Sequence, residues 1–254
     1  MHPEAYRLMA RVEDLHWWFR ARREIIRDAI ARLPLGPGAR ILEAGCGTGG
    51  NLEMLGAFGE LQACEPDREA LAVARAKGSG RVEHGHLPDG MPRDAVDLDL
   101  VCAFDVLEHI DDDAATAAEL GRRLAPGGHL VVTVPAFGWL WSAHDEAVAH
   151  KRRYTRPQLV GLLRSAGLEV RRCSYFNTLL FPVVALVRLG RRLLRLEDDG
   201  TAEMALPGRL LNRLLYAVFR SERHLLARFD LPFGVSLLAV AVRPDPAPAQ
   251  GPHS

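Results

Sequence analysis

After residue 38 the sequence alternates between short apolar runs and helical stretches, and this alternation constrains the fold more than any other feature. Seven runs are candidate strands: a first that opens at residues 41–42, a second at 61–64, a weak third at 81–83, and four more at 96–104, 129–134, 168–174 and 235–242. Several of the intervening stretches begin at an N-cap residue and end at a glycine. Strands that alternate with helices predict an α/β fold with a doubly wound, mostly parallel, Rossmann-like sheet. In such sheets ligands bind at the carboxyl ends of the strands.

The chain divides into a central α/β domain and less regular flanking segments. Residues 1–34 form an N-terminal helical segment, because residues 3–33 have helical periodicity and the run Pro34–Gly38 stops it. Residues 35–243 form the main domain. Residues 176–230 within it predict an insert of two amphipathic helices, since they separate the last two strands by far more than a hairpin. The Pro-rich residues 244–254 predict a disordered tail.

Composition excludes several classes of protein. The 254 residues carry 32 basic and 32 acidic side chains, so no nucleic-acid partner is expected. The four cysteines lie far apart, which argues against a disulfide scaffold or a structural zinc site and favours a reducing cytosol. Charges near the amino terminus exclude a secretory signal peptide, and no apolar run is long enough to cross a bilayer.

A glycine-rich loop follows the first predicted strand. Its sequence, residues 43–50, reads EAGCGTGG, and its glycines allow a ligand to lie against the main chain near a helix N-terminus. The spacing of Gly45, Gly47 and Gly50 also fits the dinucleotide pattern G-x-G-x-x-G. Glu65, at the end of the second strand, is placed to accept ribose hydroxyls in either case. The loop alone therefore leaves the nucleotide-type cofactor open.

Further motifs follow in order along the chain. An acid, Glu43, lies two residues before the first glycine of the loop, and Gly49 supplies a third glycine. The stretch 105–110 (DVLEHI) follows the fourth predicted strand, and the turn 124–128 (LAPGG) precedes the fifth. From about residue 38 to 174 the chain resembles the class I S-adenosylmethionine-dependent methyltransferases. The resemblance implies a seven-stranded sheet whose last strand is antiparallel, with S-adenosyl-L-methionine as cofactor, and makes residues 35–243 a methyltransferase domain.

The resemblance also assigns cofactor-binding residues. Glu43, Gly45, Gly47 and Gly49 would wrap the methionine portion, and Glu65 would accept the ribose hydroxyls. The remaining contacts are to adenine and to the pocket wall: His86 and Leu87, then Phe104 and Asp105. In relatives an N-terminal helix folds over the cofactor, which would bring Trp18, Arg20 or Arg23 to the methionine carboxylate; packing of this helix on the sheet fits equally well.

Three imidazoles lie near the expected strand ends and are candidate catalytic bases: His109, His144 and His150. A base is useful when the methyl acceptor is a hydroxyl that must lose its proton. The crossover after the fifth strand also concentrates aromatic and cationic side chains, from which we predict acceptor binding by Trp141, Arg152, Arg153 and Tyr154. Each histidine could instead be structural, orienting a loop or capping a helix.

A metal site is an alternative use of the same motif. Asp105, Glu108 and His109 have the spacing that places ligands on one helical face, and His144 or His150 could complete a divalent-ion site, as in some quinone-pathway and RNA-end methyltransferases that the motif resembles. Many relatives carry the same letters without a metal. We therefore predict no metal.

The function predicted is methyl transfer from S-adenosylmethionine to an oxygen of a small or lipid-like acceptor. A dinucleotide-dependent oxidoreductase and a non-catalytic cofactor-binding protein are the alternatives. The predicted insert helices, near 179–195 and 206–229, combine apolar surfaces with arginines, which fits peripheral membrane contact through residues 179–229. A cap over the pocket or a dimer interface fits the same pattern. We expect a cytoplasmic protein, with a location at the inner membrane surface if that contact forms.

Overall fold

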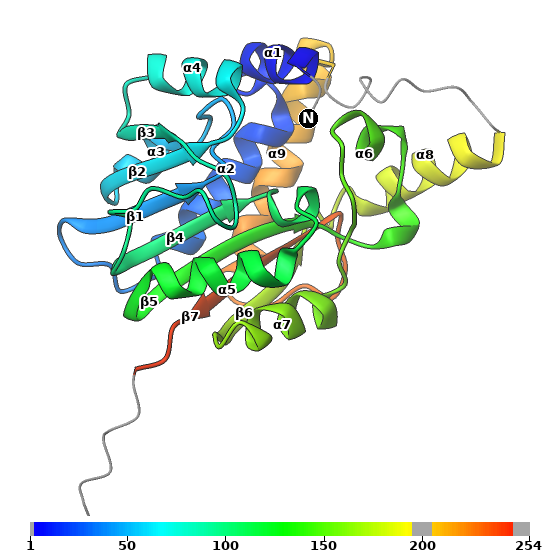
Figure 1. Cartoon of the computed structure of the whole chain (residues 1–254). Coiled ribbons are helices and arrows are strands. Elements are labelled where there is room, and N and C mark those ends of the chain that lie inside the picture. Colours follow the sequence, from blue (N-terminus) through cyan, green and yellow to red (C-terminus); the bar gives the residue numbers. More distant parts are fainter. Residues whose placement is uncertain (1–2, 195–204, 246–254) are drawn as a thin grey trace, which may run out of the picture.

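The computed structural model of the chain describes residues 3–194 and 205–245. Its centre is a seven-stranded sheet with the order β3-β2-β1-β4-β5-β7-β6 (Figure 1). The strands are β1 (Ala39–Ala44), β2 (Gly59–Glu65), β3 (Arg81–His84), β4 (Leu98–Phe104), β5 (Leu124–Pro135), β6 (Glu169–Phe176) and β7 (Ser236–Val242). β7 pairs antiparallel with both β5 and β6, whereas β1 to β5 are parallel. The predicted fold class is confirmed.

Helices cover both faces of the sheet. One face carries α2 (Trp17–Ile30), α3 (Leu52–Gly56), α4 (Arg68–Ala76) and α9 (Arg209–Leu226), and the other carries α5 (Asp113–Arg123) and α7 (Arg156–Ser165). The remaining helices are α1 (Pro3–Val12), α6 (Ala143–Ala147), α8 (Phe181–Leu194) and the short 3-10 helices η1 (Leu107–His109) and η2 (Gly138–Leu140). In Figure 1, α8 extends away from the sheet, whereas α9 runs along it. Within the described residues no helix is both long and apolar enough to cross a membrane.

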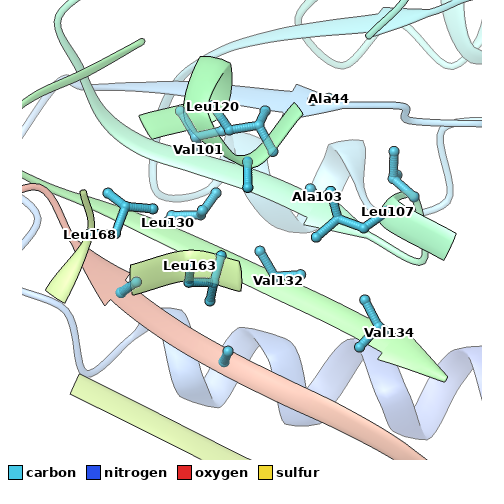
Figure 2. Packing of buried hydrophobic residues seen from close by; sticks show 14 of the residues in the cluster. Ala44, Val101, Ala103, Leu107, Leu120, Leu130, Val132, Val134, Leu163 and Leu168 are labelled. Carbon is cyan, nitrogen blue, oxygen red and sulfur yellow. The ribbon is translucent and has the colours of Figure 1, made fainter. Parts of the chain in front are cut away.

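The core has two halves because successive strand side chains point to opposite faces of the sheet. Val101 and Ala103 of β4 pack under α5 and α7, as Figure 2 shows with Leu120 and Leu163, whereas Leu100 and Cys102 belong to the cluster on the opposite face. A sheet covered on both sides needs apolar residues at nearly every central position. This requirement explains why β4 and β5 are continuous apolar runs rather than alternating ones.

The N-terminal helical segment is broken, although its sequence periodicity runs through. α1 ends at Val12 and α2 starts after the N-cap His16, whose Nδ1 accepts a hydrogen bond from the Trp18 backbone N–H at 3.2 Å. Between them Glu13 turns inward, where it accepts from the Thr48 hydroxyl at 2.8 Å and pairs with Lys77. The break lets α1 lie against α4 while α2 packs on the sheet.

The predicted insert corresponds to α8 and α9, and its residues 195–204 lie outside the described residues. So does most of the predicted tail, residues 246–254. The division of the chain into segment, domain and tail stays a prediction.

Candidate active site

The carboxyl ends of the central strands surround one cavity of about 700 Å³. That volume lies within the range of about 300–1,000 Å³ usual for small-molecule sites. Its lining starts at the glycine loop after β1, passes the ends of β2 and β4, and reaches the histidines of η1 and of the crossover after β5. Apolar side chains of α8 line the far side. A cofactor at the loop and an acceptor near α8 would thus share one cavity.

The glycine loop approaches its neighbours too closely for side chains. A Cβ on Gly45 would lie 2.8 Å from Val106 Cγ2, and Gly45, Gly47 and Gly49 all have positive φ. Gly45 and Gly47 line the cavity. Gly49 does not line it; a Cβ there would lie 2.7 Å from Leu52 Cδ1 and 3.1 Å from Ala74 of α4. Gly49 therefore shapes the loop through packing on α4.

Glu43 supplies a buried acceptor next to this loop. Its Oε1 accepts from Asn51 Nδ2 at 2.8 Å, whereas its Oε2 has no hydrogen-bond partner among the described residues. Burial raises the pKa of Glu43 to about 7, against the opposing hydrogen bond from Asn51. A buried carboxylate oxygen without a partner is costly, and a cationic group in the cavity would satisfy it. The ammonium group of the cofactor's methionine portion has this character.

Glu65 lies at the tip of β2 and is almost fully buried. Its carboxylate accepts from the backbone N–H of Gly47 at 2.8 Å and of Asp67 at 3.0 Å, and from the Tyr6 hydroxyl of α1 at 3.3 Å. Burial raises its pKa, partly offset by these donors. As an acceptor at a strand tip in the cavity, it fits a ribose with two hydroxyl donors. The predicted adenine contacts, His86 and Leu87, line the cavity as well.

An arginine of α2 reaches the end of β4. Arg22 is buried, and its Nη2 lies 2.6 Å from Asp105 Oδ2 and 2.7 Å from the Thr133 hydroxyl oxygen. Its guanidinium also lies over the rings of Trp18 and Phe104, with distances of 5.1 and 5.6 Å to the ring centroids. Asp105 and Phe104 line the cavity as predicted. Asp105 is thus held by Arg22.

Arg22 was not predicted from the sequence, which offered its neighbours Arg20 and Arg23 as the cofactor-binding arginines. Arg20 packs over the Tyr216 ring of α9, 4.4 Å from its centroid, whereas Arg23 and Trp18 line the cavity. The spacing of the residues could have identified Arg22. Trp18 and Arg22 are four residues apart, so they share one face of the helix. The buried residues Ala21, Ile25 and Ile26 show that this face points inward.

His150 is part of a buried charge network. Its Nδ1 lies 2.8 Å from Asp145 Oδ1, and Arg153 binds the same carboxylate through Nε at 2.8 Å and Nη2 at 2.9 Å. Burial alone would raise the pKa of Asp145, but the hydrogen bond from His150 and the charge of Arg153 hold it well below its usual range. Because the ionised carboxylate only accepts, Nδ1 of His150 is the donor in this contact.

His109 and His144 flank His150 in the cavity wall. The ring centroids of His109 and His150 lie 4.8 Å apart, and those of His144 and His150 lie 6.4 Å apart. His109 places Nδ1 3.2 Å from the Ala149 carbonyl oxygen, which only accepts. Nδ1 is therefore the donor, and Nε2 of the neutral His109 ring keeps its lone pair. Burial, together with the charge of His150, lowers the pKa of His109 to about 4. His109 is therefore neutral at physiological pH.

Glu108 completes this cluster. It is fully buried, neither carboxyl oxygen has a hydrogen-bond partner among the described residues, and Oε1 lies 3.7 Å from His150 Nε2. Burial and the negative charge of Asp105 raise its pKa well above the usual range. Glu108, His109 and His150 bring three potential ligand atoms within 4.8 Å of one another, so these residues could hold a divalent ion. Asp105, the other motif acid, is instead paired with Arg22.

The predicted acceptor-binding residues divide into two groups. Arg153 lines the cavity with its guanidinium bound to Asp145. Trp141, Arg152 and Tyr154 do not line it. Arg152 and Tyr154 both bind Asp113, at 2.9 and 2.7 Å, and Trp141 lies 3.4 Å from Glu146. Acceptor binding by these four residues stays a prediction. Asp145, which holds Arg153 and His150, was not singled out from the sequence.

The strand order, the glycine loop and the acid at the tip of β2 define a class of α/β proteins that bind a nucleoside-type cofactor at the strand ends. Residues 18–172 match the family model described as methyltransferase domain. The match spans more than half of the chain, which therefore belongs to the class I S-adenosylmethionine-dependent methyltransferase family. The cofactor of this family is S-adenosylmethionine.

Individual relatives and a solved structure that resemble this chain are named as methyltransferases. A probable S-adenosylmethionine-dependent methyltransferase of Mycolicibacterium smegmatis is 30% identical over 61% of this chain and 60% of its own length. A ubiquinone biosynthesis O-methyltransferase of Aromatoleum aromaticum is 30% identical over 37% of this chain and 42% of its own. The solved structure of a putative methyltransferase from Bacillus halodurans has the same fold, with a TM-score of 0.59 and 17% identity over 87% of this chain and 98% of that chain. The chain spans about 60% of the first of these relatives.

Proposed function

We propose that this protein transfers the methyl group of S-adenosylmethionine to an oxygen atom of a small or lipid-like acceptor. The observation that carries the proposal is the Asp145–His150 pair in the wall of the cofactor cavity. A carboxylate that fixes the tautomer of an imidazole and stabilises its protonated form is the usual support of a general base. Methyl transfer to a hydroxyl needs such a base, because the oxygen must lose its proton.

The chain's residues would divide the work as follows. Bound cofactor supplies a methyl group already activated on a sulfonium. The Gly45–Gly47 backbone with Glu43 and Glu65 holds the cofactor, and the cavity walls hold the acceptor oxygen in line and exclude water. His150 Nε2 takes the hydroxyl proton, and Asp145 stabilises the resulting imidazolium. His109, whose pKa is lowered to about 4, is a weak base.

Two observations support the choice of acceptor. Leu180, Val183, Val184 and Val187 line the side of the cavity away from the glycine loop, so the acceptor end is apolar. One of the relatives is named as a ubiquinone biosynthesis O-methyltransferase. Both favour a hydrophobic acceptor with a hydroxyl group. We propose that it is met in the cytoplasm at the inner membrane surface; the four buried, free cysteines fit a reducing compartment.

The test is methyl transfer from labelled S-adenosylmethionine into a cell extract, followed by mass identification and solvent partitioning of the product. With that acceptor, His150→Gln should lower kcat by about 10²- to 10⁴-fold and leave cofactor affinity unchanged. His224→Gln, on the exposed side of α9, is the matched control. His144→Gln tests the competing candidate. Full activity of His150→Gln would contradict the base assignment.

Two alternative functions were considered from the sequence. The family assignment excludes the first, a dinucleotide-dependent oxidoreductase. A non-catalytic cofactor-binding protein would bind S-adenosylmethionine yet transfer no label to any component of the extract. An oxygen-methylated product would exclude that alternative, and a nitrogen- or carbon-methylated product would overturn the choice of oxygen.

A further inference from the structure

The two faces of α8 are reversed relative to an ordinary surface helix. Its inward side includes Ala185 and Arg188, which are buried, and Arg188 donates to the Leu140 carbonyl at 2.7 Å. Its outward side is apolar: Leu186 is 71% exposed, Leu193 82% and Leu194 71%. Helices on water-soluble domains place the apolar stripe inward, because exposed leucines gain nothing from water. α8 therefore presents a surface that lacks its partner within the described chain.

The stripe has helical spacing and continues beyond the helix. Val183, Leu186, Leu189 and Leu193 recur every three or four residues, and all are exposed. At the start of α8 the exposed rings of Trp139 and Phe233 both contact Phe181, with centroid distances of 5.8 and 5.4 Å. Across the cavity, Leu210 and Leu214 of α9 are also exposed, and Leu215 of that helix lines the cavity. We call the exposed residues 183, 186, 189, 193 and 194 the α8 stripe.

Within the described residues, α8 and α9 expose arginines and no acidic side chain. α8 contains no acidic residue, and the one acid of α9, Glu222, is fully buried. Arg192, Arg209 and Arg213 are exposed, and no ion pair to another described residue accompanies them. An apolar helix face that carries the exposed Arg192 is complementary to a surface that is apolar within and anionic at its boundary. Tryptophan at the edge of such a face is typical of the headgroup region.

We propose that the α8 stripe docks on an anionic phospholipid bilayer, so that the cavity opens at the lipid surface. The argument for this occupant is the combination of exposed leucines with cations, and the position of α8 itself. Val183, Val184 and Val187 of the same helix line the cavity. A helix lying in the interface would thus form the cavity wall between the lipid and His150. The proposal deepens the proposed function and rests on it for the nature of the acceptor.

The experiment is flotation of the full chain with vesicles of neutral phosphatidylcholine, alone or mixed with phosphatidylglycerol. The wild-type protein should float with the anionic vesicles, and added salt should weaken the binding. The double variant Leu186→Ser/Leu193→Ser should lower the bound fraction at least tenfold; neither side chain lines the cavity. Arg192→Glu should remove the preference for anionic over neutral vesicles. Val96→Ser, at an exposed apolar residue remote from α8, is the matched control and should bind like the wild type.

Two further readouts separate the outcomes. Calorimetry with S-adenosylmethionine, without vesicles, should give the same affinity for the double variant and the wild type, which shows that the variant is folded and tests the cofactor site independently. Sedimentation without lipid tests a second copy as the occupant: a wild-type dimer that becomes a monomer in the double variant would overturn the proposal. Equal flotation of wild type and double variant, or no binding to anionic vesicles, would also overturn it. Loss of cofactor binding in the wild type would instead contradict the proposed function.

Discussion

At the scale of single residues, the cavity contains acids with opposite tasks. Glu43 and Glu108 are buried with oxygens that lack partners among the described residues, whereas Asp145 is fully engaged by His150 and Arg153. Buried carboxyls without partners favour the protonated form, and ion-paired ones favour the charged form. The pKa of Glu108 is accordingly raised and that of Asp145 lowered. Glu108, whose protonated form is favoured by burial, and the ionised Asp145 therefore lie on either side of the His150 ring.

We expect Glu43 to make cofactor binding depend on pH. Its pKa in the free protein is about 7, and a cationic ligand group favours its ionised form. Below pH 7 the carboxyl must lose a proton before it can pair with the ammonium group, so the affinity for S-adenosylmethionine should fall about tenfold per pH unit. Calorimetry between pH 5.5 and 7.5 measures this slope. Glu43→Gln should bind more weakly at pH 7.5 and show no such slope; an identical slope in the variant would refute the role of Glu43.

Replacing Glu65 should weaken cofactor binding by a limited amount. Glu65→Ala removes acceptors for the ribose hydroxyls and also frees the Gly47 backbone N–H. Loss of hydrogen bonds to a charged group costs about 1.5–3 kcal/mol, which corresponds to a dissociation constant about ten- to a hundredfold higher. Glu60→Ala, an exposed acid at the other end of β2, should bind normally. An unchanged dissociation constant for Glu65→Ala would move the ribose contact elsewhere.

The residues predicted from sequence are those whose role is encoded locally. The glycine loop and Glu65 follow strands directly, so a pattern of neighbouring letters suffices to place them. Asp145 and Arg22 escaped because their partners lie elsewhere in the chain: Arg22 meets Asp105 across the packed interface of α2 with β4, and Asp145 meets Arg153 through the fold of the crossover. Pairings of this kind require the tertiary structure.

At the scale of elements, the strands were predictable and the breaks between elements were not. All seven strands lie on the predicted apolar runs, since both faces of the sheet must be apolar. β5 nevertheless starts at Leu124, before the predicted start at residue 129. Two contacts extend the strand: Leu124 pairs with Leu98 of β4, and the Gly127 N–H donates to the Arg243 carbonyl. The break after α1 was missed because Leu15 preserves the periodicity while Glu13 binds Thr48.

The contact of the glycine loop with α4 leads to a stability prediction. A methyl group at Gly49 would collide with Leu52 and Ala74 in addition to straining a positive φ, whereas Gly38 has a similar φ and open space around it. Gly38→Ala should therefore lower the free energy of unfolding by about 1 kcal/mol, and Gly49→Ala by about 2–4 kcal/mol. Chemical denaturation of both variants measures the difference. Equal losses would mean that α4 moves aside at no cost.

At the scale of the whole molecule, α1 closes the glycine-loop end of the cavity and α8 forms the other end. Tyr6 of α1 donates to Glu65, and Met9 lies over the loop, 3.3 Å from the Cβ position of Gly47. We propose that the acceptor binds at the end between the histidines and α8, which both line the cavity. This division allows cofactor retention and acceptor entry to be altered separately.

Removal of α1 should loosen the cofactor. A chain lacking residues 1–12 loses the Tyr6 and Met9 contacts and exposes the loop to water, so we expect faster dissociation of S-adenosylmethionine and at least a tenfold higher dissociation constant. Stopped-flow displacement measures the rate. Arg7→Ala is the control, because the Arg7–Glu69 ion pair lies at the exposed surface of α1 and exposed pairs contribute little. Unaltered dissociation in the shortened chain would show that α1 does not cover the cofactor.

The position of β7 has a consequence for biosynthesis. β6 pairs with β7 and with no other strand in the described residues, and β7 is the strand that joins it to β5. While the ribosome is still making residues 236–242, β6 has no strand to pair with, so the nascent polypeptide cannot complete its sheet. Completion of the sheet must therefore wait until translation has passed Val242, and until then the unpaired edges of β5 and β6 are open to chaperones.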